Sequence, residues 1–305
     1  GMIRTAGRLE RWDQVSAAAV VSARARKELA SSIVSSMEDL AASNDAWSHL
    51  CGSLDEALST VDDTLLAPQV GRSFDHVIAR WCEERLEASD AAERAFVRAS
   101  SREGEDLDTL LALARLQRRT PGRELFDTLM RIHSQVLEKD DLDPLYEAAK
   151  LALEPLGDNE LALETLGKLF KEASRLWRAS KSAGGSMTPE GAARWALEEL
   201  IRIREEAGQH EEAVNLLGQG AHLPLAPQPW REMRKRAAFI AANHLEDRGR
   251  AIVLYRSILD ETPDDQEVVH ELAEVCAAEG RLPELMALRK HELALNPDPD
   301  RTLFL

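Results

Sequence analysis

Residues 264–297 read DDQEVVHELAEVCAAEGRLPELMALRKHELALNP, the most regular pattern in the chain. The apolar residues of the first half recur at i, i+4, i+7 and i+8, along one side of an α-helix: Val268, Leu272, Val275 and Cys276. Gly280 follows this helix, and a glycine in this place allows the left-handed backbone conformation that reverses the chain. A second segment rich in apolar residues then begins at Leu282. The stretch predicts two antiparallel helices joined by a tight turn.

The glycine turn recurs elsewhere in the chain. A glycine is followed five residues later by Ala or Leu, at the start of a new amphipathic segment, at 52–57, 157–162, 208–213 and 280–285. In a further copy, 246–251, Glu246 stands where the other copies have glycine. Glycine permits the tight turn, and a small residue lets two helices approach closely. Each copy therefore predicts a helical hairpin.

The composition favours helix along the whole chain. Leucine occurs 44 times, against 23 for valine and isoleucine together, and β-branched residues are the ones that a helix disfavours. Capping residues precede proline at four expected helix starts: Thr120, Asp143, Thr188 and Thr262. Ser53 and Glu56 have the spacing of a capping box. We predict an all-α chain with about fourteen or fifteen helices and no sheet.

The repeated unit resembles the tetratricopeptide repeat family. The family's unit is a helix–turn–helix of 34 residues with a glycine before the turn, small packing residues and a late proline. The resemblance is clearest in residues 143–297, where Ala251, Tyr255, Pro263 and Pro297 match the pattern, and the repeats are degenerate. It implies a right-handed α–α superhelix, a solenoid of about seven stacked antiparallel helical hairpins.

The sequence predicts four segments within this solenoid. Residues 1–105 form divergent hairpins that continue into the solenoid, and residues 106–180 form hairpins closer to the family pattern. Residues 181–187, which contain two adjacent glycines, are expected to be a flexible insertion. Residues 188–305 form the last repeats. Their C-terminal end is apolar and uncapped, so we expect the chain to be part of a larger protein.

Charge and composition exclude several classes of function. Subtracting 54 acidic from 38 basic residues leaves a net charge of −16, the wrong sign for binding nucleic acid. No apolar run is long enough to cross a membrane, and no signal peptide is recognised. The three cysteines, Cys51, Cys82 and Cys276, are far apart in sequence and form no metal or redox motif. Their unpaired use favours a reducing, cytoplasmic setting.

No pattern points to catalysis, a metal or a cofactor. His270 and Glu274 lie one helical turn apart, but no third ligand accompanies them, as a metal site would require. No glycine-rich loop has the phosphate-binding pattern. We therefore predict a non-enzymatic protein that needs no cofactor.

The resemblance implies that the first helices of successive hairpins line a groove for a peptide or a partner helix. In the family register the groove would include these residues: Trp195, Glu198, Arg202, Arg236, Ile240, Asn243, His270 and Glu274. Trp195 and Ile240 could equally belong to the core. The predicted function is a protein-interaction scaffold with a protein or peptide partner. The alternative is a regulatory or ligand-sensing region attached to a catalytic domain elsewhere in a larger protein.

Overall fold

The computed structural model describes residues 11–24, 28–61, 66–102, 106–224 and 226–295. Within these ranges the chain forms fifteen α-helices and no β-strand, which confirms the predicted all-α class. The chain divides into two compact units, unit 1 (residues 1–136) and unit 2 (residues 137–305). In unit 1, α2 (Trp12–Ala23) packs mainly on α4 (Trp47–Thr60) and only weakly on the intervening α3 (Ser31–Asn44). In unit 2 each helix packs mainly on the helices that precede and follow it in sequence. This is the packing expected of stacked helical hairpins, in which each pair buries the apolar side of the next.

Unit 1 has a continuous apolar core. Its described helices are α2 (Trp12–Ala23), α3 (Ser31–Asn44), α4 (Trp47–Thr60), α5 (Pro68–Leu86), α6 (Ser89–Ser101), α7 (Leu107–Gln117) and α8 (Arg123–Val136). Leu50 and Leu54 of α4 are buried with Phe74 and Trp81 of α5. These large side chains pack between adjacent helices, so their apolar surface is removed from water.

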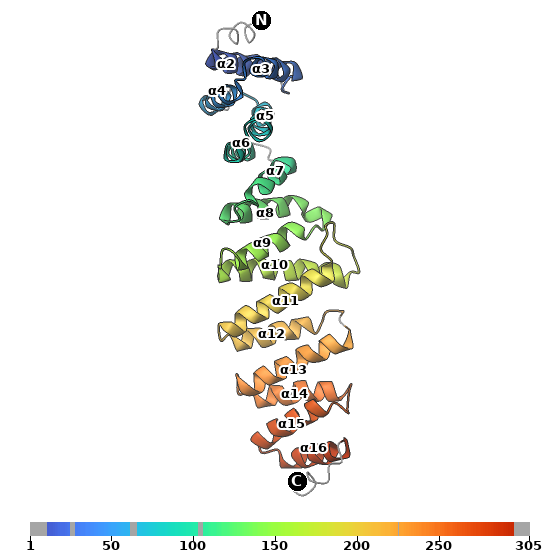
Figure 1. Cartoon of the computed structure of the whole chain (residues 1–305). Helices are drawn as coiled ribbons and strands as arrows, with labels where there is room; N and C mark the ends of the chain where they lie inside the picture. Colours follow the sequence, from blue (N-terminus) through green and yellow to red (C-terminus); the bar gives the residue numbers. More distant parts are fainter. Residues whose placement is uncertain (1–10, 25–27, 62–65, 103–105, 225, 296–305) are drawn as a thin grey trace. The chain divides into compact units, whose positions relative to one another are not determined.

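Unit 2 consists of four hairpins that run back and forth in sequence order (Figure 1). After a short 3-10 helix, η1 (Leu137–Lys139), its described helices are α9 (Asp143–Leu153), α10 (Asn159–Arg178), α11 (Pro189–Glu206), α12 (His210–Gly220), α13 (Pro227–Asn243), α14 (Arg248–Leu259), α15 (Gln266–Ala278) and α16 (Leu282–Leu295). We call α9, α11, α13 and α15 the first helices, and α10, α12, α14 and α16 the second helices.

The turns inside the four hairpins of unit 2 share one backbone conformation. Gly157, Gly208 and Gly280 have φ angles of 62°, 70° and 72°. Glu246 has a φ of 55°, so the residue that replaces glycine in the fifth copy of the motif adopts the same left-handed conformation. The alanines that follow five residues later are fully buried: Ala162, Ala213 and Ala251. Small residues thus allow close helix packing, and the hairpin prediction is confirmed for unit 2.

The turn predicted at Gly52 is absent. Gly52 and Ser53 lie inside α4, and the Ser53 hydroxyl donates to the Leu50 carbonyl at 3.2 Å instead of capping a helix. Leu50, Leu54 and Leu58 are all buried on one side of this helix. Because the apolar stripe continues across the glycine, packing keeps the helix intact, and both the turn and the capping box predicted here are wrong.

Of the four expected caps before proline, Thr188 acts as predicted. Its hydroxyl accepts from the Gly191 amide at 3.1 Å, and Pro189 occupies the first turn of α11. The helix after Thr120 begins only at Arg123. Asp265, and not Thr262, caps α15. A capping residue before proline therefore predicted approximately where a helix begins. It did not reliably identify the residue whose side chain caps that helix.

The insertion 181–187 is anchored at its C-terminal end. The Asp143 carboxylate, at the start of α9, accepts from the amides of Ser186 and Met187 at 2.7 and 2.8 Å. Partial burial favours the neutral acid, but these hydrogen bonds outweigh it and lower the pKa of Asp143. The connection between α10 and α11 is thus tied to an earlier helix by a charged group.

The fold is an all-α helical repeat, and in unit 2 the hairpin turns and the small packing residues lie in the predicted places. Residues 296–305, which include Pro297 and the apolar C-terminal end, lie outside the described residues.

Candidate partner-binding groove

Side chains link the first helices of unit 2 to one another. The rings of Tyr146 on α9 and Trp195 on α11 pack edge to face with their centres 4.6 Å apart. Arg236 on α13 donates two hydrogen bonds to Glu205 on α11, at 3.0 and 2.5 Å. Since these contacts skip the intervening second helices, the first helices lie along one face of unit 2, which we call the first-helix face.

Lys235 continues this series from α13 to α15. Its Nζ lies 3.1 Å from Asp265 Oδ2 and 2.7 Å from Glu267 Oε2. Asp265 also caps α15 by accepting from the Val268 amide at 3.2 Å. Partial burial alone would lower the pKa of Lys235, but the bonds to Glu267 and Asp265 outweigh it and raise the pKa. The lysine therefore stays charged and holds the two helices together.

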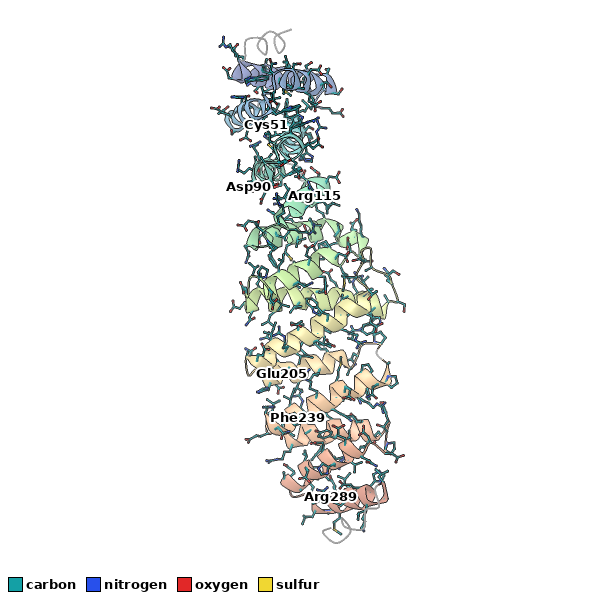
Figure 2. The ribbon with its side chains drawn as sticks, in the orientation of Figure 1. Cys51, Asp90, Arg115, Glu205, Phe239 and Arg289 are labelled. Atoms are coloured by element: carbon teal, nitrogen blue, oxygen red, sulfur yellow. The ribbon has the colours of Figure 1, made fainter. Side chains whose placement is uncertain are left out.

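A hollow of about 410 Å³, the first-helix groove, lies between α13 and α15. Its floor is Tyr255 of the intervening helix α14. Its walls are Glu232, Lys235, Arg236, Phe239, Glu267, Val268 and Glu271. Phe239 is 49% exposed, a large apolar ring that this chain leaves in water. Phe239 on α13 and Glu205 on α11 are labelled in Figure 2.

The first-helix groove has an excess of negative charge. Three carboxylates line it, against two cations that are already paired with acids. Glu271 has no cation partner among the described residues. Burial, with Glu271 and Glu267 nearby, raises the pKa of Tyr255, so its hydroxyl stays protonated at neutral pH. The groove therefore offers an apolar ring, a phenol and unneutralised carboxylates.

Three of the predicted groove residues lie on α11. Trp195 is half-buried against the aromatic ring of α9 described above. Glu198 is exposed. Arg202 is exposed but pairs along its own helix, with Glu199 at 2.6 Å and Glu206 at 2.9 Å. Two charged side chains and the edge of one ring thus extend the first-helix face beyond the hollow.

Three more predicted residues lie on α13. Arg236 lines the first-helix groove. Ile240 is only 4% exposed and belongs to the core, so its side chain is not available to a partner. Asn243 is exposed at the end of the helix, where its amide donates to the Phe239 carbonyl at 3.0 Å.

The last two predicted residues, His270 and Glu274, are exposed on α15 but face α16. The His270 Nδ1 lies 3.1 Å from Glu292 Oε1, and Glu274 pairs with Arg289. Neither lines the first-helix groove, which uses Glu267 and Glu271 of the same helix.

Sequence reasoning did not single out Phe239, although a signal was present. The core side of α13 is formed by Ala237, Ala238, Ile240 and Ala241. One residue along a helix corresponds to a rotation of roughly 100°, which carries Phe239 out of this stripe. A large apolar residue outside the apolar stripe of its helix is a candidate contact for a partner.

The described residues hold no group of three or more His, Cys, Asp or Glu side chains placed to bind a metal ion. Cys51, Cys82 and Cys276 are all buried. Within the described part of the chain, no helix combines the length and apolar character needed to cross a bilayer.

Comparison with known proteins yields structural similarity only. No protein-family model and no curated protein matches the chain. Among solved structures, the crystal structure of the APC/C hetero-tetramer Cut9–Hcn1 is 13% identical, over 96% of this chain and 54% of that one, with a TM-score of 0.31. The human IFIT1 dimer with PPP-AAAA is 11% identical, over 97% and 78% of the chains, with a TM-score of 0.25.

A circular tandem repeat protein with novel repeat topology is 18% identical, over 99% and 75% of the chains, with a TM-score of 0.19. The chain spans about half the length of the Cut9–Hcn1 chain that it matches. Because all three TM-scores are low, the fold is assigned from the order of the helices and the geometry of their turns.

Proposed function

We propose that this chain is a non-enzymatic protein-interaction scaffold whose first-helix groove binds an extended peptide of a protein partner. The observation that carries the proposal is Phe239, a half-exposed phenylalanine on the wall of a hollow between two first helices. Exposed aromatic rings in hollows are typical anchors of protein interfaces. The exposed side chains of Glu198 and Arg202 and the half-buried ring of Trp195, all on α11, would extend the contact along the same face.

The charge of the groove favours a peptide with a basic residue next to an apolar one. Lys235 and Arg236 are neutralised by acids of neighbouring helices, whereas Glu271 has no such partner among the described residues. An arginine or lysine of the peptide would pair with Glu271 while an apolar side chain packs on Phe239. Such a complementary charge speeds association and selects the partner.

Affinity capture from native extract tests this function, using the intact chain and two variants with the same substitution. Phe239→Glu adds a charge to the anchor itself. Leu111→Glu, on α7 of unit 1, is the matched control, because Leu111 is 46% exposed and lines no described hollow. We expect at least one partner to be retained by Leu111→Glu and lost by Phe239→Glu.

Equal recovery of every partner by the two variants would contradict the assignment of the groove. A second pair refines the test: Glu271→Lys should abolish binding of a basic peptide, whereas Glu198→Lys, on α11, should only weaken it. Circular dichroism of each variant verifies that the helices remain folded.

A further inference from the structure

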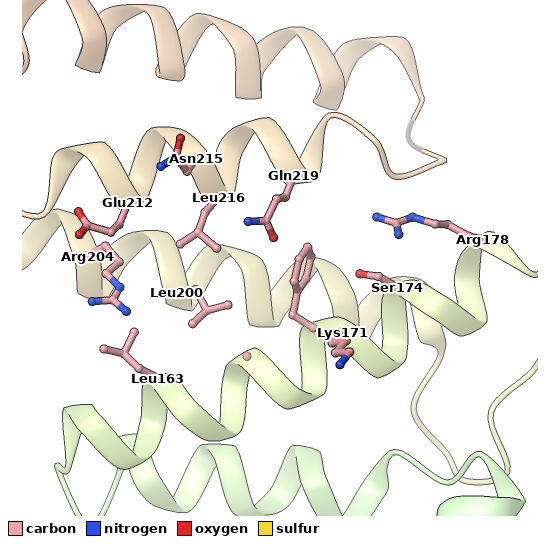
Figure 3. A pocket seen from close by; sticks show the side chains of 12 residues that line it. Leu163, Lys171, Ser174, Arg178, Leu200, Arg204, Glu212, Asn215, Leu216 and Gln219 are labelled. Atoms are coloured by element: carbon pink, nitrogen blue, oxygen red, sulfur yellow. The ribbon is translucent and has the colours of Figure 1, made fainter.

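A second hollow lies on the face of unit 2 that carries the second helices. It has a volume of about 570 Å³ and is bordered by α10 and α12, with α11 between them as its floor (Figure 3). We call it the second-helix pocket. Its apolar lining comes from all three helices: Leu163, Phe170, Leu200 and Leu216. Because a first helix forms its floor, it opens on the other face from the first-helix groove, whose floor is a second helix.

The second-helix pocket contains a buried hydroxyl without a hydrogen-bond partner. Ser174 of α10 is 3% exposed, and its Oγ has no partner among the described residues. Serine hydroxyls inside helices often bond to the carbonyl one turn earlier. Instead, Figure 3 shows this oxygen directed toward the interior of the pocket. Buried hydroxyls in proteins are nearly always satisfied, so the Ser174 hydroxyl is available to a polar group that enters the pocket.

Two cations flank this hydroxyl on the same side of α10. Lys171 lies three residues before Ser174 and Arg178 four residues after it, and both line the pocket. Neither forms an ion pair with a described residue. Their neighbours on the helix behave differently, since Lys168 pairs with Glu164 at 2.7 Å and Arg175 with Asp140 at 2.6 Å. In a chain of net charge −16, these two positive charges remain available.

We propose that the second-helix pocket binds an acidic peptide segment. A carboxylate of the segment would be held by Lys171, Arg178 and the Ser174 hydroxyl, and an apolar side chain would pack against Leu163, Leu200 and Leu216. Charge complementarity supports this occupant, because three cations line the pocket, Lys171, Arg178 and Arg204, against one carboxylate, Glu212 of α12. The preference is opposite to that of the first-helix groove, so the two sites would select different partners.

The surroundings favour a chain segment over a small molecule. Helix α12 is shared with a neighbouring hollow of about 240 Å³ between α12 and α14, which is lined by the cations Arg234 and Arg250. An extended segment could therefore continue from one hollow to the next on the same face. Arg250 is already bound to Glu211 and Asn215, at 2.8 and 3.0 Å, so Lys171 and Arg178 are expected to contribute most to binding.

Fluorescence anisotropy with labelled synthetic peptides tests the proposal on the intact chain. The acidic probe GDELLEDG is compared with its basic counterpart GKRLLRKG and its alanine counterpart GDEAAEDG. We expect only the acidic probe with leucines to bind, and its affinity to fall as salt is added. The double variant Lys171→Glu with Arg178→Glu should weaken binding about tenfold or more, because each charged hydrogen bond is lost.

Two further variants distinguish binding in the second-helix pocket from general electrostatic attraction to the chain. Arg248→Glu with Lys290→Glu makes the same change in net charge at exposed positions outside the pocket, and should change the affinity less than about twofold. Ser174→Ala removes only the hydroxyl and should weaken binding about threefold, while leaving the melting temperature unchanged or higher.

Four results would overturn the proposal: no binding of the acidic probe, equal binding of the basic probe, an equal loss in the control double variant, or tighter competing binding by a single-stranded oligonucleotide. Loss of the acidic probe in Phe239→Glu would also overturn it, because the probe would then occupy the first-helix groove. Retention in Phe239→Glu together with loss in the Lys171 and Arg178 variant would support a separate site.

Discussion

Asp75 of unit 1 is the buried centre of an ion-pair network, and its charge should be essential to the stability of that unit. Its side chain is fully buried and accepts from Arg98 Nε at 2.6 Å and from Arg102 Nε at 2.7 Å. Arg98 also reaches Asp55 at 2.6 Å, but that carboxylate is 47% exposed. The two acids thus bind the same arginine in different solvent environments. Asp75→Asn removes the buried charge without changing the volume of the side chain.

Removing one partner of a buried ion pair typically costs 3–5 kcal/mol, because the remaining charge is left uncompensated in a medium of low polarity. Arg98 keeps Asp55 in the variant, so we expect the lower end of this range, about 3 kcal/mol, or roughly a hundredfold in the unfolding equilibrium. Asp55→Asn breaks a surface pair and should cost about 0–1 kcal/mol.

The measurement is urea unfolding monitored by hydrogen-exchange mass spectrometry on peptides from α5 and α6. This readout is needed because repeat proteins can unfold in parts, so that a signal from the whole chain mixes the two units. The same experiment on peptides of unit 2 serves as the internal control. If Asp75→Asn and Asp55→Asn destabilise α5 and α6 by the same amount, the burial argument is refuted.

Three further predictions follow from local geometry. Gly52→Ala should stabilise the chain by about 0.5–1 kcal/mol, because Gly52 is helical with open space around it. Gly208→Ala should destabilise it by about 1–2 kcal/mol, because its φ of 70° disfavours a side chain. Thermal unfolding measures both changes in stability, and the same sign for both would contradict the turn assignment. Asp143→Ala should release the loop after α10 and speed tryptic cleavage after Lys181 several-fold. Because the pKa of Asp143 is lowered in the folded chain, the stabilisation of the loop by its carboxylate is complete above the ordinary carboxyl pKa and is lost as the pH falls through the folded pKa. Hydrogen-exchange protection of the loop amides measures this loss. Cys51 should not react with a thiol reagent at pH 8 until the chain unfolds, because the hydrogen bond with Cys82 and burial raise the pKa of Cys51; reaction in the folded state at the rate of a free thiol would disprove this.

Local sequence patterns predicted the hairpins of unit 2 well, and the turns show why. At Gly157, Gly208 and Gly280 the glycine ends an apolar stripe, so nothing favours continuing the helix. Even Glu246 adopts the left-handed conformation, because the helices on either side require a reversal there. At Gly52 the same local motif is overruled, since three leucines of α4 continue the buried stripe through it.

The face of each helix was harder to predict than the helix itself. Ile240 is buried and Phe239, one residue earlier, is half exposed. On α15, Glu267 and Glu271 line the first-helix groove, whereas Glu274 pairs with α16. Because a single residue turns the side chain by roughly 100°, a small error in the assumed register exchanges core and groove.

The second-helix pocket could not be inferred from the chain alone. The sequence does not distinguish Lys171, Ser174 and Arg178 from the other polar residues of α10, such as Lys168 and Arg175. Lys168 pairs with Glu164 of its own helix, a spacing that the sequence shows, but Arg175 pairs with Asp140, which precedes α9. Which cations of α10 find a carboxylate outside their own helix is decided only by the packing of the chain.

The amino-acid sequence by itself determined that the chain is helical and that unit 2 turns at four places, because backbone preference and apolar periodicity are properties of neighbouring residues. The tertiary structure alone decided which side chains remain available: Phe239 in one hollow, and Lys171, Ser174 and Arg178 in the other. The physical reason is that burial and charge pairing arise between helices distant in sequence, and the periodicity of one helix does not specify what packs against it.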